Sequence, residues 1–179
     1  MPYSAELMLA APAAHEIDAL CERLEQDPDL QTYRRLGSAP HISLAVYDQV
    51  DTQAFGAALR KFAGTLRRTP VELNQIGVFA HDECVLFLAP VVTTGLLDLH
   101  RRYHEFFGGF AKSCWDYYRP GNWCPHVTLA MNLAPPALAT ALERVAPLWR
   151  GLTTFVDAVR FASYPPLRAL DLHRLERRR

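Results

Sequence analysis

The feature of this chain that most constrains its fold is a seven-residue motif that occurs twice. Residues 40–46 (PHISLAV) match residues 125–131 (PHVTLAM) in identity or chemical type at every position. Side chains alternate between the two faces of a strand, so each motif places its His and its Ser or Thr on one face and its apolar residues on the other. The sequence therefore predicts two similar strands, each with a polar front and an apolar back.

The order of predicted elements extends this repeat to the whole chain. Apolar periodicity and turn signals predict strands at 6–10, 41–47, 71–79, 85–92, 125–132, 153–162 and 168–175, and helices at 17–24, 55–62, 96–107 and 135–149. Each half then has the order β-α-β-α-β. We predict a bilobal α+β fold with pseudo-two-fold symmetry, in which antiparallel sheets line a central cleft.

We expect residues 1–179 to form a single domain of this kind. The lobes are expected at roughly residues 1–82 and 83–179, and an exchange of terminal strands between them is one possible arrangement.

An additional segment, residues 108–123, has no counterpart in the first half. It is rich in aromatic residues, and long loops of this kind inside a compact domain are usually functional. Arg119 and Trp123 are its candidate substrate contacts, because a guanidinium can hold a phosphate and an indole can stack on a base. Packing within the loop is the alternative interpretation of both residues.

The composition limits the classes of partner that this chain is expected to bind. Nineteen basic and nineteen acidic residues give a formal net charge of zero, which disfavours a long nucleic-acid footprint but is compatible with a small nucleotide or an RNA end. The four cysteines form no Cys-x-x-Cys pair, no basic and apolar leader is present, and the apolar runs are too short to span a membrane. We expect a reduced, cytoplasmic monomer without membrane contact.

The residues of the two motifs are suited to displacement at phosphorus. Such a reaction needs one group to remove a proton from the attacking oxygen and another to protonate the leaving oxygen. Histidine can do either near neutral pH, since its unperturbed pKa is about 6.5. His41 and His126 are therefore the candidate acid and base, and the hydroxyls of Ser43 and Thr128 can donate to phosphate oxygens. This scheme requires neither a metal ion nor a cofactor.

On these motifs the sequence resembles the 2H phosphoesterase superfamily, which contains bacterial 2′-5′ RNA ligase-like proteins and cyclic phosphodiesterases. Segments 76–79 and 85–90 also look like family segments. The resemblance implies a bilobal α+β fold, general acid–base roles for His41 and His126, and phosphate binding by Ser43 and Thr128. It also implies a 2′,3′-cyclic phosphate or a 2′-5′ phosphodiester as substrate. The turn at 81–83 (HDE) departs from the family, because RNA ligase-like members often carry a basic residue there.

Two other functions are compatible with the same residues. A non-catalytic module could hold a nucleotide or RNA end in the same cleft, and a metal-dependent hydrolase could use His41 and His126 with a carboxylate such as Asp116. His100 and His104 also have a spacing that metal pairs use, but the Glu of a zincin motif is missing between them. We expect those two histidines on a solvated helix face.

Overall fold

The computed structural model describes residues 1–80 and 84–176. The strands are β1 (Tyr3–Leu9), β2 (Gln31–Thr32), β3 (His41–Tyr47), β4 (Thr69–Phe79), β5 (Cys84–Pro90), β6 (Val127–Leu133), β7 (Leu152–Ser163) and β8 (Arg168–Arg174). The helices are α1 (Ala11–Leu24), α2 (Thr52–Ala63), α3 (Thr94–Phe106) and α4 (Pro135–Val145). The chain therefore runs β-α-β-α-β twice, as predicted, with the short β2 and the final β8 added.

The strands form one antiparallel sheet whose order is symmetric about its centre. The order is β2-β6-β5-β4-β7-β1-β3, and β8 pairs with β7. If β1, β3 and β4 of the first half are matched to β5, β6 and β7 of the second, the sequence β6-β5-β4-β7-β1-β3 maps onto itself. This confirms the predicted α+β fold with antiparallel strands and pseudo-two-fold symmetry.

The same order joins each half of the chain to the other. The last strand of the first half, β4, pairs with β5, and the last strand of the second half, β7, pairs with β1. At the centre, β4 and β7 pair with each other over Thr69–Leu73 and Leu152–Val156. The predicted boundary between the lobes and the predicted turn at 81–83 lie outside the described residues, so the division at residue 82 stays a prediction.

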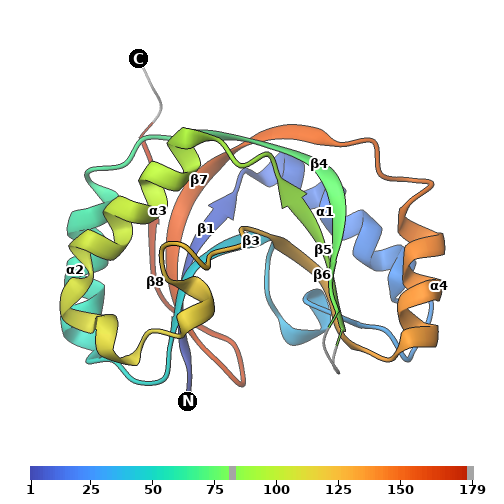
Figure 1. Ribbon diagram of the computed structural model, residues 1–179, viewed down its shortest axis with the longest axis horizontal. Coiled ribbons are helices and arrows are strands. Elements are labelled where there is room, and N and C mark those ends of the chain that lie inside the picture. The colour runs from blue at the N-terminus through green and yellow to red at the C-terminus, as the bar shows by residue number, and fades with distance from the viewer. Residues whose placement is uncertain (81–83, 177–179) are drawn as a thin grey trace.

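The helices cover the outer face of the curved sheet in two pairs (Figure 1). α2 and α3 lie over the β1, β3, β7 and β8 side, whereas α1 and α4 lie over the β5 and β6 side, where they contact each other. Asp51 caps α2 by accepting hydrogen bonds from the backbone N–H groups of Gln53 and Ala54, both at 3.0 Å. Within the described residues, no helix is long and apolar enough to cross a membrane.

The curvature of the sheet brings its two repeated strands together. β3 and β6 lie far apart in the order of the sheet and are not hydrogen-bonded to each other, yet they are in contact. We call the side of the sheet that the helices leave uncovered the inner face. The polar fronts of the two motifs are on this face.

An aromatic cluster packs α2 against the sheet and α3. Phe55 is fully buried, and its ring contacts Phe161 of β7 at a centroid distance of 4.4 Å and Phe107, which follows α3, at 4.8 Å. Tyr47 of β3 lies edge-on to the same ring at 5.3 Å. Because these rings come from distant parts of the sequence, they fix α2 and α3 behind β3.

Replacing Phe55 with Ala should therefore lower the free energy of unfolding by about 3–5 kcal/mol, which is the usual cost of removing a buried aromatic ring. Phe106→Ala is the matched control, because that ring is 45% exposed. Urea denaturation measures both variants. Equal losses of stability would contradict the central position given to Phe55.

Candidate active site

His41 and Ser43 lie on the inner face of β3, as the sequence predicts. Both are partly exposed, whereas Ile42 and Leu44 between and after them are fully buried against the helices. His126 directly precedes β6 and shows the same pattern, since His126 and Thr128 are partly exposed and Val127 is fully buried. Each motif therefore presents an imidazole and a hydroxyl on the side away from the core.

The two imidazoles are anchored in the same way. Nδ1 of His41 lies 2.8 Å from the carbonyl oxygen of Ala39, and Nδ1 of His126 lies 2.8 Å from the carbonyl oxygen of Cys124. In both motifs a proline separates the two residues and restricts the residue before it to extended backbone. A carbonyl can only accept, so each Nδ1 carries the proton and donates it. Nε2 is then the nitrogen available for chemistry in both rings.

The contact between β3 and β6 brings the two histidines close enough to interact. The pKa of His126 is lowered, first by burial of its ring and further by the positive charge of His41. Such repulsion favours a state in which one ring is charged and the other neutral. A general acid and a general base need that difference.

The surroundings of the two rings differ. His126 lies edge-on to Phe79, with ring centroids 4.8 Å apart, and 5.4 Å from the ring of Phe87. Nε2 of His41 lies instead 3.6 Å from a carboxylate oxygen of Glu6, a residue whose side chain is 2% exposed. One imidazole is therefore set among apolar rings and the other beside an anion.

Ser43 is held from the additional loop. Its side chain interacts with the phenol of Tyr118, whose pKa is raised to about 12, mainly by burial. The indole N–H of Trp123 donates to the backbone carbonyl of Ser43 at 2.9 Å. The loop at 108–123 thus lies against the first motif, although it is close in sequence to the second.

The sequence matches a known protein family over most of its length. A model described as the 2′-5′ RNA ligase superfamily matches residues 10–165. The chain belongs to this superfamily. The match confirms the resemblance to 2H phosphoesterases that the two motifs indicate, while a search of curated proteins gives no match.

Solved structures show the same fold as this superfamily member. TT0787 of Thermus thermophilus is similar with a TM-score of 0.67 at 15% identity, over 100% of both chains. LigT of E. coli in its apo form is similar with a TM-score of 0.62 at 17% identity, over 98% of each chain. LigT complexed with 3′-AMP gives a TM-score of 0.63 at 15% identity, over 97% of this chain and 96% of that one.

The other predicted loop contact, Arg119, is engaged within the loop. Its guanidinium lies 3.0 Å from the carboxylate of Asp116 and donates to the backbone carbonyls of Ala111 and Cys114. In this structure Arg119 and Trp123 both hold the loop in place. Their contact with substrate stays a prediction.

The prediction that His100 and His104 lie on a solvated helix face is wrong. His100 is 2% exposed, its ring is stacked on Trp123 at 3.9 Å, and the Nε2 atoms of the two histidines are 3.0 Å apart. His100 Nε2 also faces the carbonyl oxygens of Leu44 at 3.2 Å and Tyr118 at 2.9 Å. The pair therefore lies between α3, β3 and the loop. Helical spacing alone did not predict the burial of His100, because the residue that covers it, Trp123, belongs to a loop outside the helix.

Glu6 and Arg160, which we did not predict from the sequence, share the inner face with His41. Arg160 of β7 forms a buried ion pair with Glu6 of β1 and donates to the hydroxyl of Ser38 at 3.2 Å. A signal was present in β1, where polar Ser4 and Glu6 alternate with apolar Ala5 and Leu7. That alternation is the same one that identifies the two motif strands.

Residues 1–80 and 84–176 contain no group of three or more His, Cys, Asp and Glu side chains arranged to hold a metal ion. The carboxylate of Asp116, which the metal-dependent alternative would use, is paired with Arg119.

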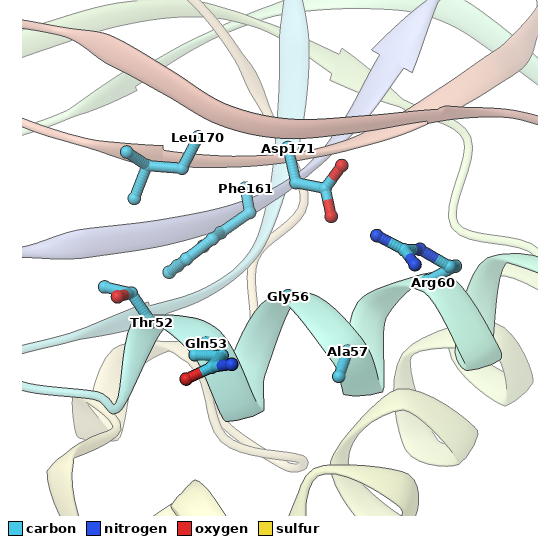
Figure 2. Close-up of a pocket in the computed structure, with 8 residues that line it drawn as sticks. All are labelled: Thr52, Gln53, Gly56, Ala57, Arg60, Phe161, Leu170 and Asp171. Atoms are coloured by element: carbon cyan, nitrogen blue, oxygen red, sulfur yellow. The ribbon is translucent and has the colours of Figure 1, made fainter.

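A separate cavity of about 510 Å³ lies between α2 and β8 (Figure 2). Phe161 of β7 lines it, whereas the preceding Arg160 is directed to Glu6 on the inner face. Neighbouring residues of a strand point to opposite faces, so this cavity lies behind the sheet relative to His41. None of its lining residues belongs to the two motifs: they are Thr52, Gln53, Gly56, Ala57, Arg60, Phe161, Leu170 and Asp171.

The burial of His100 predicts how stability depends on pH. Its pKa is lowered from 6.5 to about 4, first by burial and then by the charge of His104. Between these two pH values the unfolded chain binds a proton that the folded protein excludes, so acidification favours unfolding. Acidification from pH 7 to pH 5 should therefore cost wild type about 2 kcal/mol more than His100→Gln, by proton linkage.

Urea denaturation at both pH values measures this difference. His15→Gln serves as the control, because His15 is exposed and should leave the pH dependence of wild type unchanged. The same pH dependence in wild type and His100→Gln would show that His100 titrates normally in the folded protein.

Proposed function

We propose that this protein is a metal-independent phosphoesterase that acts on a 2′,3′-cyclic phosphate or a 2′-5′ phosphodiester of a nucleotide or an RNA end. The observation that supports this most directly is the matched pair of imidazoles on contacting strands, each with Nδ1 bound to a carbonyl at 2.8 Å. Both Nε2 atoms are thereby left for proton transfer. Membership of the 2′-5′ RNA ligase superfamily supports a phosphoesterase-like or ligase-like activity on nucleotides.

A structural neighbour supports a nucleotide as ligand. Crystal structures of E. coli LigT have been solved with 3′-AMP, with ATP, with NADP⁺ and with phosphate. A protein of the same fold therefore accepts nucleotides and free phosphate. We extend this ligand class to the present chain because its two motifs provide groups that can bind a phosphate.

In the hydrolytic direction, one histidine removes a proton from water as the water oxygen attacks phosphorus, and the other protonates the ribose oxygen that leaves. Ser43 and Thr128 donate from their hydroxyls to the non-bridging oxygens, where negative charge is held during the displacement. In the ligase direction a 5′-hydroxyl attacks the cyclic phosphate with the same groups. A neutral imidazole and a charged one are needed at the start in either case.

We expect wild type to hydrolyse members of a panel of 2′,3′-cyclic nucleotides and 2′-5′ dinucleotides in excess EDTA. His41→Ala and His126→Ala should each lose about 100- to 10,000-fold in kcat, because each removes a proton-transfer group. His15→Ala, a change at an exposed histidine of α1, should keep wild-type activity.

Binding of a nucleotide without turnover by wild type would favour a non-catalytic module. Loss of wild-type activity in EDTA would contradict the metal-independent mechanism.

The hydroxyl variants test phosphate binding separately from proton transfer. Ser43→Ala and Thr128→Val should each lower kcat by about 100-fold, the effect expected when a donor to a developing negative charge is lost. Thr140→Val on α4 is the matched control, since its hydroxyl donates to the backbone carbonyl of Pro136. Wild-type kinetics in both motif variants would remove Ser43 and Thr128 from the mechanism.

A further inference from the structure

A carboxylate and a guanidinium are buried together on the inner face of the sheet. The side chains of Glu6 and Arg160 are 2% and 10% exposed, and Nε of Arg160 donates to Glu6 Oε2. The hydroxyl of Ser4 donates to Glu6 Oε1 at 2.6 Å. The carboxylate is therefore held from two sides, by its own strand and by β7.

Burial of this ion pair is costly for a fold. Desolvation of two charges often exceeds the attraction between them, and apolar residues of similar volume would serve stability as well or better. The neighbouring positions Ala5 and Leu7 are apolar and fully buried against the helices. A charge on the opposite face of the same strand therefore points to a function on the inner face.

The pair contacts only one of the two motif histidines in the described structure. Glu6 Oε1 lies 3.6 Å from His41 Nε2, and Arg160 reaches the other side of the ring through Ser38, whose hydroxyl is 3.5 Å from His41 Nδ1. His126 has Phe79 and Phe87 as its ring neighbours instead, and its pKa is lowered by burial. An anion beside an imidazole favours the charged form, whereas apolar surroundings favour the neutral form.

We propose that Glu6 is a positioning residue that keeps His41 protonated, so that His41 is the general acid and His126 is the general base. This assignment rests on the proposed phosphoesterase function and gives the two equivalent-looking motifs different roles. Arg160 and Ser4 act on His41 through Glu6, because they fix the carboxylate.

The other ionisable groups near Glu6 leave this assignment unchanged. Arg160 is the only other charged partner of Glu6 within the described residues, and it balances part of the carboxylate charge. The pKa of Tyr118 is raised to about 12, and the pKa of Tyr164 is also raised, in both cases mainly by burial and in part by Glu6. Both phenols are therefore neutral near pH 7 and add no charge to the site.

With these roles, every proton and bond in the hydrolytic step is accounted for. Nε2 of neutral His126 takes a proton from water while the water oxygen forms a bond to phosphorus. The bond between phosphorus and one ribose oxygen breaks, and that oxygen takes the proton from Nε2 of His41. The products are a phosphomonoester and a ribose hydroxyl, with His126 now charged and His41 neutral. Proton exchange with solvent restores the starting state.

The pH dependence of kcat/KM tests the assignment on the substrates that wild type hydrolyses. Its ascending limb should report His126 losing a proton and its descending limb His41 losing one. Glu6→Gln should move the descending limb to lower pH, so that the rate above that limb falls while the ascending limb stays in place. Glu6→Asp keeps the negative charge and should recover part of the shift.

Asp171→Asn is the matched control. Asp171 also lies beside a histidine, 2.9 Å from His173 Nε2, but it lines the cavity behind the sheet. This variant should leave both limbs in place. A uniform loss of rate in Glu6→Gln with no movement of the descending limb would show that Glu6 is merely structural, and movement of the ascending limb alone would overturn the assignment.

Histidine-ring NMR tests the proposal without turnover. In uniformly ¹⁵N-labelled protein, with signals assigned from His41→Ala and His126→Ala, His41 should keep its second proton to higher pH than His126. Glu6→Gln should reduce or reverse that order. If wild type hydrolyses no substrate but His41 still keeps its second proton to higher pH than His126, the phosphoesterase function fails and the effect of Glu6 on His41 stands. If His126 keeps its second proton to higher pH in wild type, the proposed effect of Glu6 is wrong.

Removal of one charge leaves Arg160 buried without its partner, which can prevent folding. The double variant Glu6→Gln/Arg160→Met removes both charges and keeps similar side-chain volumes. It should fold and show the same reduced protonation of His41 as Glu6→Gln. Unchanged protonation of His41 in this folded variant would overturn the proposal.

Discussion

The pairing of β4 with β7 is the constraint on which the rest of the structure depends. These are the last strands of the two repeats, and they pair with each other while each also pairs with the first strand of the other repeat. The repeats are therefore joined through hydrogen bonds along the whole sheet. Because the sheet also curves, β3 and β6 come into contact, and two motifs separated by more than eighty residues share one site.

Within that site, the duplicated motifs give the two histidines the same local geometry, but the neighbouring strands give them different surroundings. Both imidazoles donate from Nδ1 to the carbonyl of the residue two positions earlier, so both leave Nε2 available. β1 and β7 then place a buried ion pair next to His41, whereas β4 and β5 place Phe79 and Phe87 next to His126. Phosphoryl transfer with two histidines needs this asymmetry, because the rings must start in different protonation states.

The sequence predicted the elements and the strand faces of the four motif residues because their signals are local. Strand alternation fixes the face of His41 and Ser43 from a few neighbouring residues, and the second copy supports the interpretation. The ion pair could not be predicted in this way, since Glu6 and Arg160 are 154 positions apart and only strand pairing makes them neighbours. For the same reason, helical spacing placed His100 in solvent, although the loop carrying Trp123 covers it.

The measurement that tests the central claim most directly is a titration of ¹⁵N-labelled protein with adenosine 2′-monophosphate, followed through the histidine-ring signals. If the two motifs bind one phosphate together, the Nε2 signals of His41 and His126 shift along a single binding curve, while the Nδ1 signals remain those of hydrogen-bonded N–H groups. A shift of only one ring, or two separate binding curves, would contradict a shared site.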